Sequence, residues 1–201
     1  MSYSGKRAID LILTLVTAPL WLPAMLLTAA LVWTRLGRPV LFRQERPGLR
    51  GRGFELIKFR TMTDARGPSG QLLADAERLT PFGKWLRASS LDELPELINV
   101  LRGDMSLVGP RPLLMKYLPK FSPNHGRRHE VRPGITGLAQ ISGRNALSWD
   151  DRLDLVVEYV DSASPILDFK ILLRTVGTVF LRRGITAEGA ATMPEFEGST
   201  R

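Results

Sequence analysis

One stretch near the N-terminus constrains the chain more than any other feature. Between Asp10 and Arg35 the sequence carries no charged residue. A helix over residues 11–34 is long enough to cross the hydrocarbon core of a bilayer, which needs about 20 predominantly apolar residues. The run is long for a signal peptide and has no obvious small-residue cleavage site. We therefore expect a membrane anchor here.

The sequence leaves open how this anchor meets the bilayer. Pro19 and Pro23 lie mid-segment, where each removes a backbone donor and disturbs the preceding turn. Basic residues flank both ends, so charge sets no orientation for a spanning helix. A straight span and a re-entrant helix, which enters and leaves by the same face, both remain open. The flanking basic residues are Lys6, Arg7, Arg35 and Arg38.

The overall charge and the missing cysteines limit the chemistry. The chain has 28 Lys and Arg against 20 Asp and Glu, a net charge of +8. That excess implies anionic partners, whether nucleic acid, lipid headgroups or phosphorylated substrates. With no cysteine, disulfides, Cys-ligated zinc and thiolate catalysis are excluded. Two histidines, His125 and His129, also argue against a histidine-rich metal site.

The pattern along the rest of the chain predicts an α+β fold that is mostly helical. Residues 54–59 are strand-like, with turns at Gly48, Gly51 and Gly53 and a loop over 66–70. Residues 106–143 are rich in Pro and Gly and should be irregular. Two helices should follow, over 149–161 and 165–183.

The last of these helices is amphipathic. Its apolar residues recur at helical spacing, which fits either a core-facing helix or a helix lying in the membrane interface. The sequence leaves both open. The apolar set is Ile166, Phe169, Leu172, Leu173, Val176, Val179 and Phe180.

Residues 89–103 carry the clearest candidate chemistry. Pro95 is tolerable only near a helix start, which predicts a helix from about residues 92–94 to Gly103. Its apolar residues, Leu94, Leu97, Ile98 and Leu101, should face the core. Asp92 and Glu93 would then lie at the positive helix end.

The acidic pair has two interpretations. Ser90 and Glu93 fit a capping box, a purely structural role. Alternatively, a carboxylate pair near basic motifs can bind an anionic substrate with a metal, and an Asp can attack phosphorus. The basic residues in those motifs are Lys58, Arg60, Arg87 and Arg111.

Two further clusters suit phosphate binding or simple turns. Pro110 and Pro112 bracket Arg111, and a guanidinium on such a stiff loop can bind phosphate in bidentate fashion. The small residues within 131–137 and 140–145 would let the backbone approach a ligand. Neither cluster decides between ligand binding and a turn by itself.

Together these motifs resemble a known family. Residues 58–62 (KFRTM), 90–95 (SLDELP), 103–112 (GDMSLVGPRP) and 132–137 (RPGITG) are similar, in order and spacing, to the bacterial sugar transferases. These are the monotopic polyprenyl-phosphate phosphoglycosyl transferases, and the likeness covers nearly the whole chain. Including residues 143–149, it looks most like the small enzymes that transfer phospho-diacetylbacillosamine from UDP-diacetylbacillosamine to undecaprenyl phosphate.

The resemblance implies an architecture and a location. Residues 1–36 would form a re-entrant membrane helix kinked at Pro23. Residues 37–201 would form a catalytic domain with interfacial amphipathic helices, at the cytoplasmic face of the bacterial inner membrane. Membrane lipid would be a partner and nucleic acid would not. The oligomeric state stays open, with a homodimer as one option.

The resemblance also implies roles for individual residues. Asp92 would be the nucleophile and Glu93 its partner, both close to Mg²⁺. The expected phosphate- and substrate-binding residues are Lys58, Arg87, Arg111, Pro112, Arg132 and Arg144. One position departs from the family pattern, because Val156 stands where an Asp usually lies three residues before the tyrosine matching Tyr159. Asp154 is the nearest substitute.

The expected reaction moves a sugar-1-phosphate, from a UDP-sugar with an N-acetylated amino sugar, to undecaprenyl phosphate. UMP would leave, and an aspartyl phosphosugar would form on Asp92. Two other classes compete with this enzyme. A basic membrane protein that binds nucleic acid or lipid would show salt-sensitive DNA binding. A scaffold for glycan assembly would tolerate Asp92→Asn.

Overall fold

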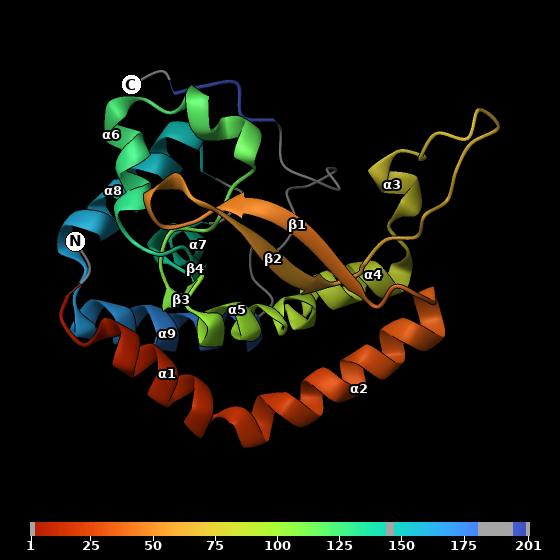
Figure 1. Cartoon of the computed structure of the whole chain (residues 1–201), viewed down its shortest axis with the longest axis horizontal. Helices are drawn as coiled ribbons and strands as arrows, with labels where there is room; N and C mark the ends of the chain where they lie inside the picture. Colours follow the sequence, from red (N-terminus) through yellow and green to blue (C-terminus); the bar gives the residue numbers. More distant parts are fainter. Residues whose placement is uncertain (1–2, 144–146, 181–194, 200–201) are drawn as a thin grey trace.

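The computed structural model of the chain describes residues 3–143, 147–180 and 195–199. Two N-terminal helices, α1 (Lys6–Val16) and α2 (Ala18–Leu36), form a wide V beneath the rest of the molecule (Figure 1). The outer end of each helix reaches the domain above, and the apex of the V points away from it. The apolar segment is therefore a helical hairpin in the structure.

The interruption between α1 and α2 lies at Thr17. Pro19 stands in the first turn of α2, where its missing N–H leaves a carbonyl of α1 without the donor that would continue the helix. The Trp21 indole nitrogen donates to the Thr14 carbonyl oxygen at 2.9 Å, which satisfies another carbonyl at this break. Pro23, where we expected the kink, lies inside α2.

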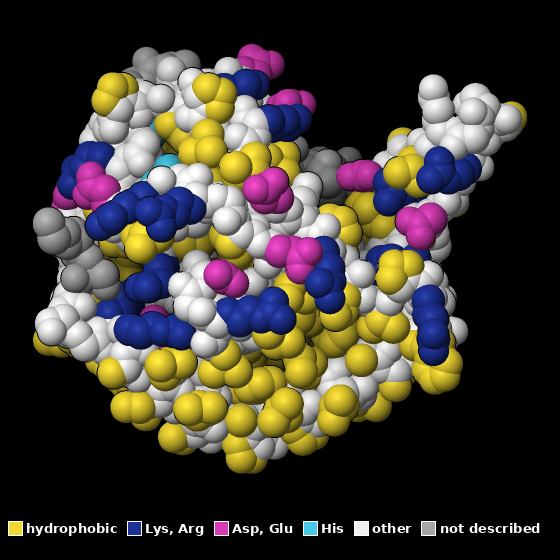
Figure 2. Space-filling view, in the orientation of Figure 1, with side chains coloured by type: hydrophobic (Ala, Val, Ile, Leu, Met, Phe, Trp, Pro, Cys, Tyr) yellow, Lys and Arg dark blue, Asp and Glu magenta, His cyan; other side chains and the backbone are white. Residues whose placement is uncertain are grey.

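The hairpin leaves a broad apolar surface uncovered. In the described part of the chain, α2 is the single helix long and apolar enough to cross a membrane. Figure 2 shows hydrophobic side chains along the whole lower edge of the molecule, over α1 and α2. An apolar surface of this extent marks an interaction with lipid or protein. Its exposed members include Ile12, Leu15, Val16, Leu20, Leu26, Leu27 and Trp33.

A two-stranded antiparallel sheet crosses the middle of the domain. Strands β1 (Leu41–Pro47) and β2 (Gly53–Phe59) pair from Leu41 opposite Phe59 to Pro47 opposite Gly53, and a short turn, η1 (Leu49–Gly51), joins them. The predicted strand is confirmed as β2. Its partner β1 was not predicted, because the sequence LFRQERP is too polar to read as a strand.

A second, parallel pair lies in the region expected to be irregular. Strand β3 (Ser106–Val108) pairs with β4 (Gly134–Thr136). The backbones approach so closely that a Cβ on Gly134 would lie 2.0 Å from the Gly109 nitrogen. The glycines of this region are thus required for packing.

Short helices fill most of the remaining domain, and two longer ones close it. The two expected C-terminal helices are confirmed as α8 and α9, and α3 lies on an arm that projects from the domain (Figure 1). The elements are α3 (Asp75–Arg78), α4 (Pro81–Ala88), η2 (Leu91–Glu93), α5 (Glu96–Arg102), η3 (Met115–Lys120), α6 (Pro123–Gly126), η4 (Arg127–Glu130), α7 (Leu138–Ile141), α8 (Trp149–Ser162) and α9 (Pro165–Phe180).

Helix α5 corrects two expectations. It begins at Glu96, later than residues 92–94, although it ends before Gly103 as predicted, with that glycine at a φ of 92°. Its buried face is not the apolar one, because Asn99 turns toward β2 and bonds the Ile57 nitrogen (3.1 Å) and the Glu55 carbonyl (2.7 Å). The expected core residues Leu94, Leu97, Ile98 and Leu101 are only half-buried.

Helix α9 packs one side against the domain and exposes large apolar side chains on another. Asp168 and Ile171 are buried, whereas the larger apolar residues of the predicted stripe face outward. A purely core-facing role is therefore wrong for this helix. The exposed stripe is Ile166, Phe169, Leu173 and Val176, and the side chains of Val179 and Phe180 lie outside the described ones.

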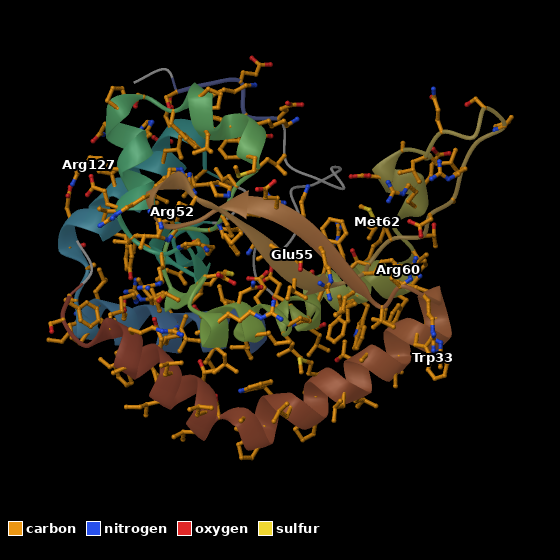
Figure 3. All side chains as sticks on the ribbon, viewed as in Figure 1. Trp33, Arg52, Glu55, Arg60, Met62 and Arg127 are labelled. Atoms are coloured by element: carbon orange, nitrogen blue, oxygen red, sulfur yellow. The ribbon has the colours of Figure 1, made fainter. Side chains whose placement is uncertain are left out.

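Polar contacts dock the hairpin on the domain at both ends. Near the N-terminus the Asp168 carboxylate accepts from Lys6, from Tyr3 at 2.8 Å and from Tyr159 at 2.8 Å. At the end of α2, the Arg60 guanidinium donates to the Leu36 carbonyl. Figure 3 shows Arg60 above the end of α2 that carries Trp33. These contacts hold both arms of the V against the domain.

Candidate active site

Three segments bring charged side chains together above the hairpin. Lys58 lies on β2, Glu93 on η2, and Arg111 on the proline-bracketed loop after β3. Lys58 Nζ is 2.9 Å from Glu93 Oε1, and Arg111 Nη2 hydrogen-bonds the same oxygen. Three of the residues expected from the sequence therefore form one cluster, although they are spread over more than 50 positions of the chain.

Glu96 completes the cluster, and it was not singled out from the sequence. Its Oε1 lies 2.8 Å from Lys58 Nζ, as an ion pair without hydrogen-bond alignment, and the residue is almost fully buried. Its position three residues after Glu93, on the same helical side, is the signal that could have found it. Lys58 thus forms ion pairs with two carboxylates.

Asp92 lies beside this cluster with a different electrostatic character. The residue is 8 % exposed, and in the described part of the chain no donor is hydrogen-bonded to its carboxylate. Burial, reinforced by the negative charge of Glu93, raises the pKa of Asp92 to about 7. Asp92 therefore changes its charge near neutral pH.

Glu93 is driven the opposite way by its cations. Burial alone would raise its pKa, but Arg111 and Lys58 together hold the pKa well below the usual range. The charge of Glu93 in turn raises the pKa of Arg111. Two adjacent carboxyl groups with pKa values pushed apart are typical of sites in which each group has its own chemical task.

The capping-box interpretation of the pair is wrong. Ser90 adopts a left-handed conformation, with a φ of 56°, and among the described residues its side chain caps no helix. The Glu93 carboxylate binds Lys58 and Arg111 instead of the start of its own helix. The geometry therefore favours the chemical interpretation of Asp92 and Glu93.

The other expected phosphate-binding residues lie at different places. Arg87 is close enough to Asp92 for the two charges to interact, and its Nε donates to Thr61 Oγ1 at 3.0 Å. Arg132 donates to the Gly103 carbonyl at 2.8 Å, at the far end of α5 from the carboxylates. The Pro112 carbonyl accepts from Arg46. Arg144 lies outside the described residues.

The departure at Val156 has a structural counterpart. Val156 is buried in α8, whereas Asp154 is bound to the ring of His125, with Oδ1 2.9 Å from Nε2. Asp154 is thus engaged in a contact of its own on a different side of the helix. It does not take the place that the family pattern gives to an Asp at 156.

The carboxylates suit a magnesium ion completed by a substrate. Within the described ranges, no group of three or more His, Asp or Glu side chains is arranged to hold a metal. Mg²⁺ is commonly held by one or two carboxylates together with substrate phosphates, so Asp92 and Glu93 fit such an ion. The Arg111 side chain is 44 % exposed, which leaves N–H groups available for an anion.

Comparisons with known proteins agree with this geometry. The family described as "Bacterial sugar transferase" matches residues 1–182. An uncharacterized sugar transferase, EpsL of Bacillus subtilis, is 55 % identical over 175 residues, which cover 87 % of each chain. A UDP-glucose:undecaprenyl-phosphate glucose-1-phosphate transferase of Caulobacter vibrioides is 40 % identical over 181 residues, covering 85 % of this chain and 68 % of that one.

A third relative differs in its sugar. A UDP-N-acetylgalactosamine-undecaprenyl-phosphate N-acetylgalactosaminephosphotransferase of Aeromonas hydrophila is 38 % identical over 182 residues, covering 87 % of this chain and 43 % of that protein. The family match spans the hairpin, the charged cluster and all of α8 and α9. This chain therefore belongs to the bacterial sugar transferase family.

Proposed function

We propose that the chain transfers a sugar-1-phosphate from a UDP-sugar to undecaprenyl phosphate and releases UMP. The observation that carries the proposal is the pairing of Asp92, buried with a pKa of about 7, with a Glu93 held ionised by two cations. The names of the Caulobacter and Aeromonas relatives, which act on UDP-sugars and undecaprenyl phosphate, support this reaction class.

The reaction would proceed in two displacements at phosphorus. A carboxylate oxygen of Asp92 attacks the β-phosphorus of the UDP-sugar, and the bond to the UMP oxygen breaks. An oxygen of undecaprenyl phosphate then attacks the same phosphorus. The bond to Asp92 breaks, the carboxylate is restored, and the sugar leaves on the lipid diphosphate.

The neighbouring residues supply charge and position. Phosphoryl transfer depends on positioning and charge neutralisation more than on proton chemistry. Arg111 has the exposure and planar donors to bind the donor phosphates, while Lys58 holds Glu93 in place. Mg²⁺, held by Asp92 and Glu93, would offset the charge that develops on the phosphate oxygens.

The hairpin would bring this site to the lipid acceptor. We infer a re-entrant anchor, because both arms of the V end at the domain and its apolar apex points away. The exposed stripe of α9 would lie in the interface of the same leaflet. We propose that the catalytic domain lies on the cytoplasmic face of the inner membrane, as the family resemblance implies.

For the sugar we propose an N-acetylated amino sugar. The motifs of residues 143–149 and the N-acetylgalactosamine named for the Aeromonas relative support it, while the Caulobacter relative is named for glucose. A panel of UDP-sugars, with UMP release as readout, decides this point. Faster release from UDP-glucose than from every N-acetylated donor would contradict it.

Intact-mass measurement tests the covalent mechanism. Wild type incubated with UDP-sugar and Mg²⁺, without lipid, should release UMP and gain one phosphosugar, which maps to Asp92. Asp92→Asn should show neither, and Glu93→Gln should be severely impaired. Glu55→Gln is the matched control and should behave as wild type, because this exposed carboxylate on β2 pairs only with Arg43 on β1 among the ion pairs of the described residues. Turnover without an adduct would favour direct transfer in a ternary complex.

A further inference from the structure

The C-terminal segment returns to the domain and inserts an aromatic side chain. We call residues 195–199 the clasp. Phe196 is 0 % exposed, and the exposed Glu195 pairs with Lys116 beside it. The clasp lies beyond the 182 residues that match the family. Its placement is therefore a property of this chain that the family motifs do not describe.

Phe196 occupies an aromatic pocket formed by η3 and the start of α8. Its ring centroid lies 5.4 Å from that of Tyr117, 5.3 Å from that of Phe121 and 5.1 Å from that of Trp149. These are the separations of favourable aromatic pairs. The backbone is bound as well, because Lys120 Nζ donates to the Phe196 carbonyl at 3.1 Å.

The far end of the clasp is fixed by Ser199. Its amide donates to the Lys120 carbonyl at 3.1 Å, and its hydroxyl lies 2.9 Å from Nδ1 of the buried His125. The Ser122 amide donates to the same hydroxyl at 3.3 Å. Contacts at both ends show a specifically bound segment rather than a tail resting on the surface.

A chain of direct contacts leads from Phe196 to the active-site loop. The Phe196 ring stacks on Phe121, with 28° between the planes. The guanidinium of Arg128 lies over the Phe121 ring, 5.1 Å from its centroid. Arg128 is 4 % exposed, and its Nη2 donates to the Arg111 carbonyl at 2.7 Å.

The same loop is held from its second side by the aromatic cluster. Leu113 and Leu114, which directly follow the Arg111–Pro112 pair, pack against the core cluster that contains Tyr117, Leu153 and Phe196. The backbone of Arg111 is thus held on one side by the hydrogen bond from Arg128 to its carbonyl and on the other by the packing of Leu113 and Leu114. The side chain of Arg111, held in this way, forms its ion pair with Glu93.

We propose that Phe196 is a positioning residue, and that the clasp holds Arg111 in the orientation that binds the donor phosphates. This inference rests on the proposed function. A segment that only covered apolar surface would affect the stability of the fold. A segment that positions Arg111 also sets the affinity for the UDP-sugar and leaves the lipid acceptor unaffected.

Full-length Phe196→Ala, Phe196→Leu and Glu195→Ala test the proposal by steady-state kinetics and hydrogen exchange. Phe196→Ala should raise the KM for UDP-sugar about three- to tenfold, the size expected when a contact network modulates a distant site. The KM for undecaprenyl phosphate should stay unchanged. Phe196→Leu should recover part of the loss, and Glu195→Ala, which removes an exposed ion pair, should match wild type.

Hydrogen exchange reports on the clasp independently of activity. The Ser199 amide and the Gly134 amide, which donates to the Pro110 carbonyl next to Arg111, should both exchange faster in Phe196→Ala. In an Arg111→Ala background, Phe196→Ala should add less than about a twofold change in donor KM, because the side chain that the clasp positions is then absent.

Either of two results would overturn the clasp proposal: released exchange at Ser199 with an unchanged donor KM, or an undiminished effect of Phe196→Ala without the Arg111 side chain. Wild type that releases no UMP from any UDP-sugar would instead refute the proposed function. In that case the Gly134 exchange still decides whether the clasp positions the loop.

Discussion

Lys58 Nζ lies 2.9 Å from Glu93 Oε1, with the two side chains 16 % and 18 % exposed. The same ammonium group lies 2.8 Å from Glu96, so one partly buried cation is shared by two carboxylates, while the third, Asp92, stands beside them. This pairing keeps Glu93 ionised, whereas Asp92 gains or loses its proton near neutral pH. Five predictions test it and the architecture around it.

Lys58→Met should destabilise the domain severely. Removing the cation leaves Glu93 and Glu96 buried with reduced compensation, and breaking a buried ion pair from one side costs about 3–5 kcal/mol. Chemical unfolding in detergent micelles measures the loss. Lys58→Met combined with Glu96→Gln should recover part of it, because one buried charge is then gone. A loss below about 1 kcal/mol for the single variant would contradict this account.

The rate at which the Asp92 adduct forms should increase as the pH rises through 7. The attacking group is the carboxylate, and burial raises the pKa of Asp92 to about 7. Single-turnover UMP release without lipid should therefore increase about tenfold between pH 6 and pH 8 and then level off. UDP-sugar is kept saturating and Mg²⁺ limiting, because a metal ion bound at Asp92 would itself favour the carboxylate and lower its pKa. A rate that is flat over this range would show that Asp92 is ionised throughout.

Asp92→Asn should be more stable than wild type in mildly alkaline solution. The folded pKa of Asp92 is raised above its ordinary value of 3.8, so its contribution to stability is present at low pH and is lost as pH rises toward 7. We expect the amide to be roughly 1–4 kcal/mol more stable at pH 8 and close to wild type near pH 4. Thermal unfolding at the two pH values measures the difference. An equal change in stability at both pH values would mean that the fold does not raise the pKa of Asp92.

Arg111→Ala should abolish most activity and leave the fold largely intact. The side chain is 44 % exposed, so its removal opens no cavity in the core. Arg111→Lys should recover only part of the activity, because a point charge cannot replace the planar donors on phosphate. UMP release and thermal unfolding are measured on the same preparations. Wild-type activity in Arg111→Ala would remove this residue from the site.

Site-specific labelling tests the hairpin. Cysteines introduced at Ser4 and Arg38, beyond the outer ends of α1 and α2, should both react only from the cytoplasmic side. Pro19→Leu should shift the anchor toward a full span, since it restores the backbone donor missing where α1 and α2 meet. Pro23→Leu serves as the comparison inside α2. Periplasmic labelling at Ser4 in wild type would contradict the re-entrant anchor and leave the chemistry untouched.

The sequence by itself determined the local features. An uncharged segment with two prolines predicts an interrupted apolar helix, and strand-like residues before Arg60 predict β2. Gly103 predicts the end of α5, because few other residues accept its left-handed backbone. The motif order identified the family and placed Asp92, Glu93, Lys58 and Arg111 among the candidates. Each of these inferences depends on residues close together in the chain.

Only the tertiary structure decided how those pieces meet. Glu96 joins the charged cluster because β2 packs against α5 and brings Lys58 within reach of it. Asn99 displaces the apolar face of α5 from the core because it can bond two backbone groups of β2 at once. Phe196 reaches its pocket from the opposite end of the chain. Burial and charge pairing between distant segments are sums over the whole fold, and no local pattern encodes them.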